Sequence, residues 1–203
     1  MLRAGFIRHR DGFGTDAANR YAVVLHDDPD NATALSNLSH LLSAAGQHDC
    51  AIALSRRAVE IEPGALGPII NLARALRAVG QHKVATDLLE VVTLADSSIS
   101  VAWHLLGQTH QFAGNFDKAI ECYDEAIEIN PSSSEARQIR HDKAIALLAA
   151  GRWSDGLREF EARWYKTENN EFCSILSTMR PITSFIRQNG AASLPNIPIK
   201  ETA

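Results

Sequence analysis

Residues 100–133 read SVAWHLLGQTHQFAGNFDKAIECYDEAIEINPSS, and their spacing of small and apolar residues is repeated along the chain. Glycine and alanine columns recur every 34 residues: Gly12, Gly46, Gly80 and Gly114, and Ala17, Ala51, Ala85 and Ala119. Proline keeps the same interval at Pro29, Pro63 and Pro131, with Ser97 in the remaining place. A fixed period of this length indicates a repeated pair of antiparallel helices, in which each unit buries its apolar side against the next.

Each column has a physical role in a helix pair. Glycine ends the first helix, because it enters the left-handed conformation without strain. Proline ends the second helix and separates one unit from the next. Small residues at Ser39, Ala73 and Gly107 allow the two helices of a pair to approach closely. The apolar residues of 38–45 follow an i, i+3, i+4, i+7 pattern, which predicts an amphipathic helix.

The third unit resembles the tetratricopeptide repeat. It contains Trp103-x2-Leu106-Gly107-x2-His110, then Gly114, Ala119-x3-Tyr123, Ala126 and Pro131, with His110 in a place where that family prefers tyrosine. The resemblance implies an all-α fold, a right-handed superhelical solenoid of stacked antiparallel helix pairs. We expect the array to span residues 1–165, with a partial unit at 1–31 and complete units at 32–65, 66–99, 100–133 and 134–165.

The two ends of the array depart from the repeat. Gly151 lies 37 residues after Gly114, so the first helix of the fourth unit is predicted to carry three extra residues. The repeat pattern ends near Lys166, and residues 166–203 contain Pro181, Gly190 and further prolines. We expect this segment to form a short capping helix near 172–179 followed by a flexible tail.

The family resemblance implies a concave groove, lined mainly by the first helix of each pair, that binds a peptide or a partner protein. By register, the predicted groove residues are Ser36, Asn37, His40, Ile70, Asn71, Arg74, Arg77, His104, Gln108, Gln111 and Phe112. Asn37 and Asn71 either bond a peptide backbone or bond within the array. The arginines either hold an acidic peptide or C-terminal carboxylate, or form a solvated pair. Members of the family that bind chaperone tails use lysine and asparagine where Ser36 and His40 stand, which argues against that ligand here.

Composition and motifs exclude several other classes of protein. The chain has 203 residues, a net charge of −4, 45% hydrophobic and 22% charged residues, so it lacks the basic excess of a nucleic-acid binder. No apolar run is long enough for a membrane span, and three widely spaced cysteines fit a reducing cytoplasm. We find no metal-binding, phosphate-binding or nucleophile motif, and therefore predict no catalytic residue, no metal and no cofactor.

Two further functions stay open alongside a scaffold or adaptor that binds proteins. Residues 142–164, which end in Phe160-Glu-Ala-Arg-Trp164, resemble the last repeat of bacterial proteins whose tetratricopeptide units precede a glycosyltransferase-like domain. That resemblance implies a regulatory or substrate-recruiting arm, with the catalytic domain absent from this chain. A secretion-type chaperone is the second alternative. A homodimer through the exposed end faces of the array is also a hypothesis.

Overall fold

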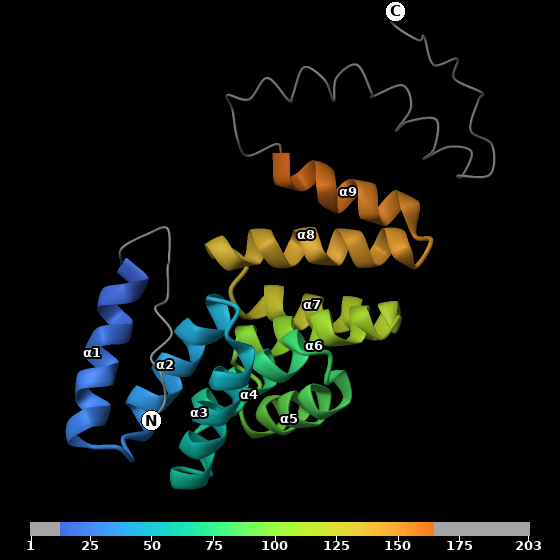
Figure 1. The fold of residues 1–203 in the computed structure, drawn as a ribbon. Helices are drawn as coiled ribbons and strands as arrows, with labels where there is room; N and C mark the ends of the chain where they lie inside the picture. Colours follow the sequence, from blue (N-terminus) through green and yellow to red (C-terminus); the bar gives the residue numbers. More distant parts are fainter. Residues whose placement is uncertain (1–12, 165–203) are drawn as a thin grey trace, which may run out of the picture.

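The computed structural model describes residues 13–164, which form nine α-helices joined by short turns. The helices are α1 (Phe13–Asp27), α2 (Ala32–Ala44), α3 (His48–Ile61), α4 (Leu66–Ala78), α5 (His82–Ala95), α6 (Ser100–Phe112), α7 (Phe116–Ile129), α8 (Ser134–Ala149) and α9 (Trp153–Trp164). Each helix packs on the next in chain order, so the pairs stack one upon another (Figure 1). The predicted all-α solenoid of helix pairs is confirmed. None of these helices is both long and apolar enough to cross a lipid bilayer.

The pairs differ in the length of their first helix. α2, α4 and α6 each contain 13 residues, whereas α8 contains 16. The three extra residues predicted for the fourth unit are therefore present in α8. α1 stands in the place of a second helix and packs on α2. The first helix of the partial unit and the capping helix predicted near 172–179 both lie outside the described residues.

Glycine ends the first helix of every complete pair. The φ angles of Gly46, Gly80, Gly114 and Gly151 are 78°, 81°, 78° and 78°. At the end of α4, the Gly80 N–H donates to the carbonyl of Arg77 (3.0 Å), and the Gln81 N–H donates to that of Leu76 (2.9 Å). These bonds satisfy carbonyls that the end of a helix leaves open. The predicted role of the glycine column is thus confirmed at these four positions.

Within a pair, the side chains at the point of closest approach have complementary volumes. Gly107 on α6 faces the fully buried ring of Tyr123 on α7, and a Cβ at position 107 would lie 2.6 Å from the Cε1 atom of that ring. One unit earlier, the equivalent positions hold Ala73 and Leu89, and both are fully buried. In these two pairs a smaller residue on the first helix accompanies a larger one on the second, which keeps the interior close-packed.

The first helices form the inner row of the stack. α2 contacts α4, α4 contacts α6, and α6 contacts α8, whereas no comparable contact joins consecutive second helices within residues 13–164. A two-layer stack bends toward the row that is spaced more closely. The face built by α2, α4, α6 and α8, called the inner face below, is therefore the concave side.

We predict that Gly107→Ala destabilises the chain by about 1–3 kcal/mol, because the added methyl group would overlap the buried ring of Tyr123. Gly67→Ala is the matched control, since Gly67 lies in α4 and a Cβ added there would meet no atom within 4 Å. At position 67 the loss of backbone freedom in the unfolded chain is expected to give a gain of about 0.5 kcal/mol. Urea unfolding followed by circular dichroism measures both changes.

The same measurement on Gly107→Ala combined with Tyr123→Leu tests the cause. This double variant reproduces the alanine and leucine pair found one unit earlier, so the two substitutions should be less destabilising together than the sum of their separate effects. Equal effects of alanine at positions 67 and 107, or strict additivity in the double variant, would contradict the volume complementarity.

Candidate functional site

The predicted groove residues lie on α2, α4 and α6, which are all first helices, and all but two of them retain exposed surface. The two exceptions require a correction. Ser36 is only 6% exposed because Asn71 of the next unit covers it, and Ile70 is 7% exposed because it belongs to the central core. Neither side chain can form part of a contact surface.

Asn71 joins two successive units. Its Nδ2 group donates to the backbone carbonyl of Ser36 (3.1 Å) and approaches the Ser36 hydroxyl oxygen (3.0 Å). The donor side of this amide is therefore engaged within the array, and its carbonyl oxygen is left to accept a bond from elsewhere. Asn37, at the equivalent place one unit earlier, is half-buried.

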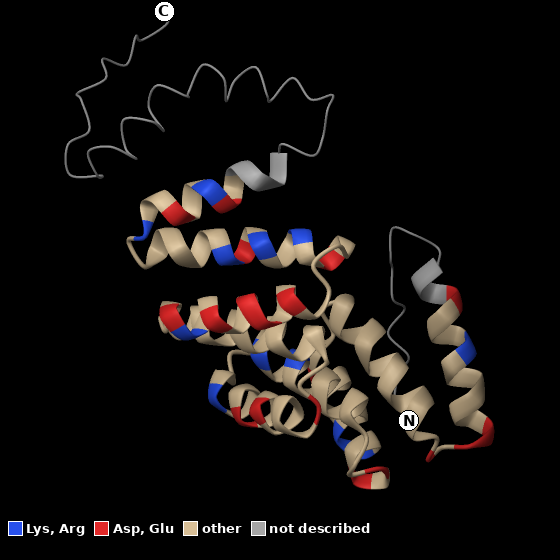
Figure 2. Cartoon of the chain, turned by 180° about the vertical axis from the view of Figure 1, so that it is seen from behind, with Lys and Arg blue, Asp and Glu red and all other residues tan. Residues whose placement is uncertain are grey.

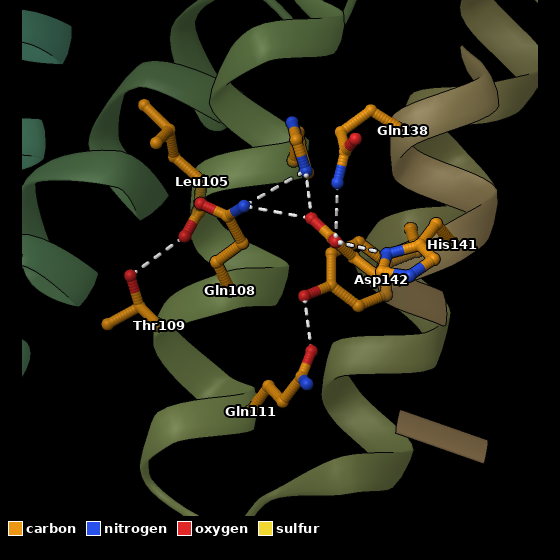
Figure 3. A network of polar contacts seen from close by, with 9 residues as sticks. Leu105, Gln108, Thr109, Gln111, Gln138, His141 and Asp142 are labelled. Atoms are coloured by element: carbon orange, nitrogen blue, oxygen red, sulfur yellow. Dashed lines mark hydrogen bonds and ion pairs between the residues drawn. The ribbon is translucent and has the colours of Figure 1, made fainter. Parts of the chain in front are cut away.

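A polar network centred on Asp142 connects α6 to α8 (Figure 3). One carboxylate oxygen lies 2.8 Å from His104 Nε2 and 2.9 Å from Gln108 Nε2. The other lies 3.0 Å from Gln138 Nε2 and 3.4 Å from His141 Nδ1. Since carboxylate oxygens can only accept, we infer that His104 carries its proton on Nε2. Asp142, which is not among the predicted groove residues, thus bonds two residues that are, His104 and Gln108.

The register of the repeat contains a signal that identifies Asp142. It lies 34 residues after Gln108, in the column that also holds His40 and Arg74. The predicted groove residues end at Phe112, so they include none from the fourth unit. In α8 the inner-face residues keep the 34-residue interval as far as Asp142.

The ionisation of Asp142 follows from this network. Burial alone would raise the pKa of its carboxyl, but the hydrogen bonds from His104 and Gln108 outweigh burial and lower the pKa to about 2. The group is therefore a permanent anion at neutral pH. A neighbouring residue of the second row, Tyr123, donates its phenolic hydroxyl to Gln111 Oε1 over 2.7 Å. Burial, followed by the charge of Asp142, raises the pKa of Tyr123, so its hydroxyl stays protonated.

Arg74 and Arg77 lie one turn apart on α4 and are half-buried. Burial is the main cause that lowers the pKa of each guanidinium. The charge of Arg77 lowers the pKa of Arg74 further. At Arg77, the neighbouring Tyr123 and Asp142 oppose the downward shift. His40 on α2 is affected in the same way, because burial and then the charge of Arg74 lower its pKa. Arg74 and Arg77 are called the arginine pair below, and His40 lies beside them on the inner face.

Phe112 forms an exposed stack at the end of α6. Its ring lies parallel to that of His82 on α5, with centroids 5.6 Å apart and an interplanar angle of 9°. The Arg77 guanidinium carbon lies 5.9 Å from the Phe112 ring centroid, within cation–π range. Even so, Phe112 is 69% exposed. His82 is the first residue of α5 and contacts this ring.

Charged groups of the last two pairs are matched to each other. Acidic residues recur along α7 and basic residues occur along α8 (Figure 2). The Lys143 ammonium on α8 bonds the carboxylate of Asp124 on α7 and lies 3.1 Å from that of Glu159 on α9. Residues 13–164 contain no cluster of three or more histidine, cysteine or acidic side chains arranged for a metal ion.

Comparison with known proteins identifies one of the repeats. Residues 100–133 match the family model of the tetratricopeptide repeat. Small glutamine-rich tetratricopeptide repeat-containing protein 2 of Mycosarcoma maydis is 28% identical over 90 residues, which are 44% of this chain and 26% of that protein. The chain spans about a quarter of the length of the curated relatives that it matches.

Solved structures share the same solenoid. TTC0263, a tetratricopeptide protein of Thermus thermophilus, has a TM-score of 0.68 and 18% identity, covering 84% of this chain and 92% of that one. YrrB, described as a tetratricopeptide protein with an unusual peptide-binding site, has a TM-score of 0.62 and 16% identity, covering 86% of each chain. At these identities the likeness shows the fold. The resemblance of residues 142–164 to repeats that precede glycosyltransferase-like domains stays a prediction.

We predict that Asp142→Asn destabilises this tetratricopeptide array by about 1–3 kcal/mol at pH 7, because hydrogen bonds to a charged acceptor are weakened. The pKa of Asp142 in the folded state, about 2, lies below the ordinary value of about 3.9. The stabilisation by this carboxylate is therefore complete above about pH 4 and is lost as the pH falls toward 2.

Urea unfolding at a series of pH values between 2 and 7 measures the effect. The difference between wild type and Asp142→Asn should shrink as the pH falls below about 4. Asp49→Asn, at an exposed position on α3, is the control and should change stability by less than about 0.5 kcal/mol. A difference that is independent of pH over this window would show that the network does not stabilise the charged form of Asp142.

Proposed function

We propose that the chain is an interaction scaffold whose inner face binds an extended segment of a partner protein. The observation that carries this proposal is the row of partly exposed polar side chains contributed by the successive first helices α2, α4 and α6. The amide oxygens of Asn71 and Gln108, the arginine pair, and the amide NH2 group of Gln111 can bond a peptide at intervals along the row. The shared fold with YrrB, itself described as having a peptide-binding site, supports the proposal.

The ionisation of Asp142 and Cys122 supports a binding role for the chain. Asp142, with a pKa of about 2, is too weak a base to exchange protons efficiently near neutral pH. Burial raises the pKa of the Cys122 thiol to about 12, which removes the thiolate that a nucleophile would need. The titrating groups with strongly shifted pKa values in residues 13–164 are thus held in fixed charge states, as suits a recognition surface.

We place this role in a reducing compartment such as the cytoplasm. Cys122 is buried and unpaired, while Cys50 is exposed on α3 and also unpaired among the described residues. An exposed free thiol is compatible with a reducing environment and is a liability in an oxidising one.

The proposal predicts that two exposed apolar side chains respond differently to substitution. Phe112 ends an inner-row helix and is 69% exposed, whereas Leu94 lies on α5 of the outer row and is 87% exposed. Peptides selected by the full chain from a random display library should lose affinity at least about tenfold on Phe112→Asp, because an aromatic contact is removed and a charge is introduced. Leu94→Asp should change it less than about twofold.

Fluorescence anisotropy with the selected peptides measures both affinities. Thermal melting of each variant controls for folding. The opposite pattern, with affinity lost only on Leu94→Asp, would place the binding surface on the outer row. Failure to select any peptide that binds the folded chain would contradict peptide binding itself.

A further inference from the structure

The arginine pair stands out as an unmatched charge on the inner face. Among residues 13–164, the Nε atoms of Arg74 and Arg77 are enclosed by protein and make no hydrogen bond. The ion pairs formed within the described part of the chain include neither side chain. Both residues are half-buried and their Nε atoms are enclosed, so the guanidinium groups have lost part of their hydration without gaining an anionic partner there.

Lys143 shows how this protein otherwise treats a half-buried cation. Its ammonium is bracketed by the carboxylates of Asp124 and Glu159. The exposed Arg57 likewise lies 2.9 Å from Asp30. A partly desolvated charge without a counter-ion is unfavourable for folding. The contrast indicates that the arginine pair is kept for an anion that comes from outside the described array.

The nearest inner-face carboxylate cannot serve as that anion. Asp142 is close enough to influence the pKa of Arg77, but its two oxygens accept from His104, Gln108 and Gln138. Phe112 meanwhile packs beside the Arg77 guanidinium, which limits the directions that this side chain can take. Preorganised and partly desolvated guanidinium groups bind carboxylates well because less freedom and hydration are lost on binding.

We infer that the arginine pair binds two carboxylate side chains of an acidic peptide segment in a partner protein. This inference rests on the proposed binding of an extended segment to the inner face. Side chains one turn apart on a helix have Cβ atoms about 5–6 Å apart. In an extended peptide, alternate side chains lie on the same side and about 6.6 Å apart. The spacing therefore fits two acidic residues separated by one residue, each accepting from one guanidinium fork.

The experiment uses the full chain and a pool of N-acetylated, C-amidated dodecapeptides that contain Glu-x-Glu at a fixed position between randomised flanks. A matched pool contains Gln-x-Gln, and a third contains Gln-x-Gln with a free C-terminal carboxylate. We expect the peptides retained from the Glu-x-Glu pool to bind at least about tenfold more tightly than their glutamine counterparts. Preferential retention of the third pool would assign the site to a chain terminus and overturn the inference.

Variants then test whether the arginines carry that preference. The double variant Arg74→Gln, Arg77→Gln should abolish the difference in affinity between glutamate and glutamine peptides. The double variant Arg74→Lys, Arg77→Lys should retain part of that difference, because lysine keeps the charge but lacks the bidentate fork. Arg20→Gln with Arg56→Gln, two exposed positions on α1 and α3, makes the same change in net charge and should leave the difference intact. If this control variant also lost the preference for glutamate peptides, the preference would depend on the overall charge of the chain and not on the arginine pair.

Thermal melting separates ligand binding from a structural role. Because the arginines lack partners within the described array, Arg74→Met with Arg77→Met should melt at the same temperature as the wild type or higher. A clear fall in melting temperature would show that the pair is needed for folding.

If peptides bind in a manner sensitive to Phe112→Asp but without preference for glutamate, this inference fails while the proposed function stands. If a second copy of the chain fills the inner face, light scattering will show a dimer that the glutamine variant dissociates, and the inference is overturned.

Discussion

The solenoid depends on how closely the two helices of each pair can approach. At that contact the first helix carries a small residue, Ser39, Ala73 or Gly107, which lies opposite Ser55, Leu89 or Tyr123 of the second helix. The Ser39 and Ser55 hydroxyls are 2.9 Å apart in the first complete pair, and Gly107 lies against a tyrosine ring in the third. Stacked helix pairs of this kind form a curved array with an inner face.

The polar groups of the inner face fall into two regions that differ in their hydrogen bonding. On its later units, between α6 and α8, Asp142 organises His104, Gln108 and Gln138 into a satisfied network. On α4, the arginine pair lacks such a partner within the described residues. The polar groups between α6 and α8 are thus hydrogen-bonded to one another around the Asp142 carboxylate, whereas the arginine pair carries positive charge without an ion-pair partner among the described residues. A chain with net charge −4 therefore still presents a local surface that attracts anions, because a short-range field depends on nearby groups.

The periodicity of the sequence predicted features that repeat, namely the helix pairs, the glycine caps and the extra length of α8. It predicted less well the features that depend on contacts between units. Ser36 was expected on the surface but is covered by Asn71, which lies 35 residues later. The stack of Phe112 on His82 also joins two units, and its geometry depends on the superhelical twist, which a one-dimensional register does not contain. Asp142 was missed although its column is readable, because the extra residues of α8 obscured where the register changes.

We propose that the inner face receives a partner chain through the arginine pair. The most direct measurement is a two-dimensional NMR titration that follows the arginine Nε–H resonances and backbone amides of the isotope-labelled full chain with a selected acidic peptide. The account predicts that the Nε–H signals of Arg74 and Arg77 shift on binding, together with amides of α4 and α6, while that of Arg56 on α3 stays in place. Shifts confined to α3, α5 and α7, with both inner-face arginine signals unmoved, would contradict it.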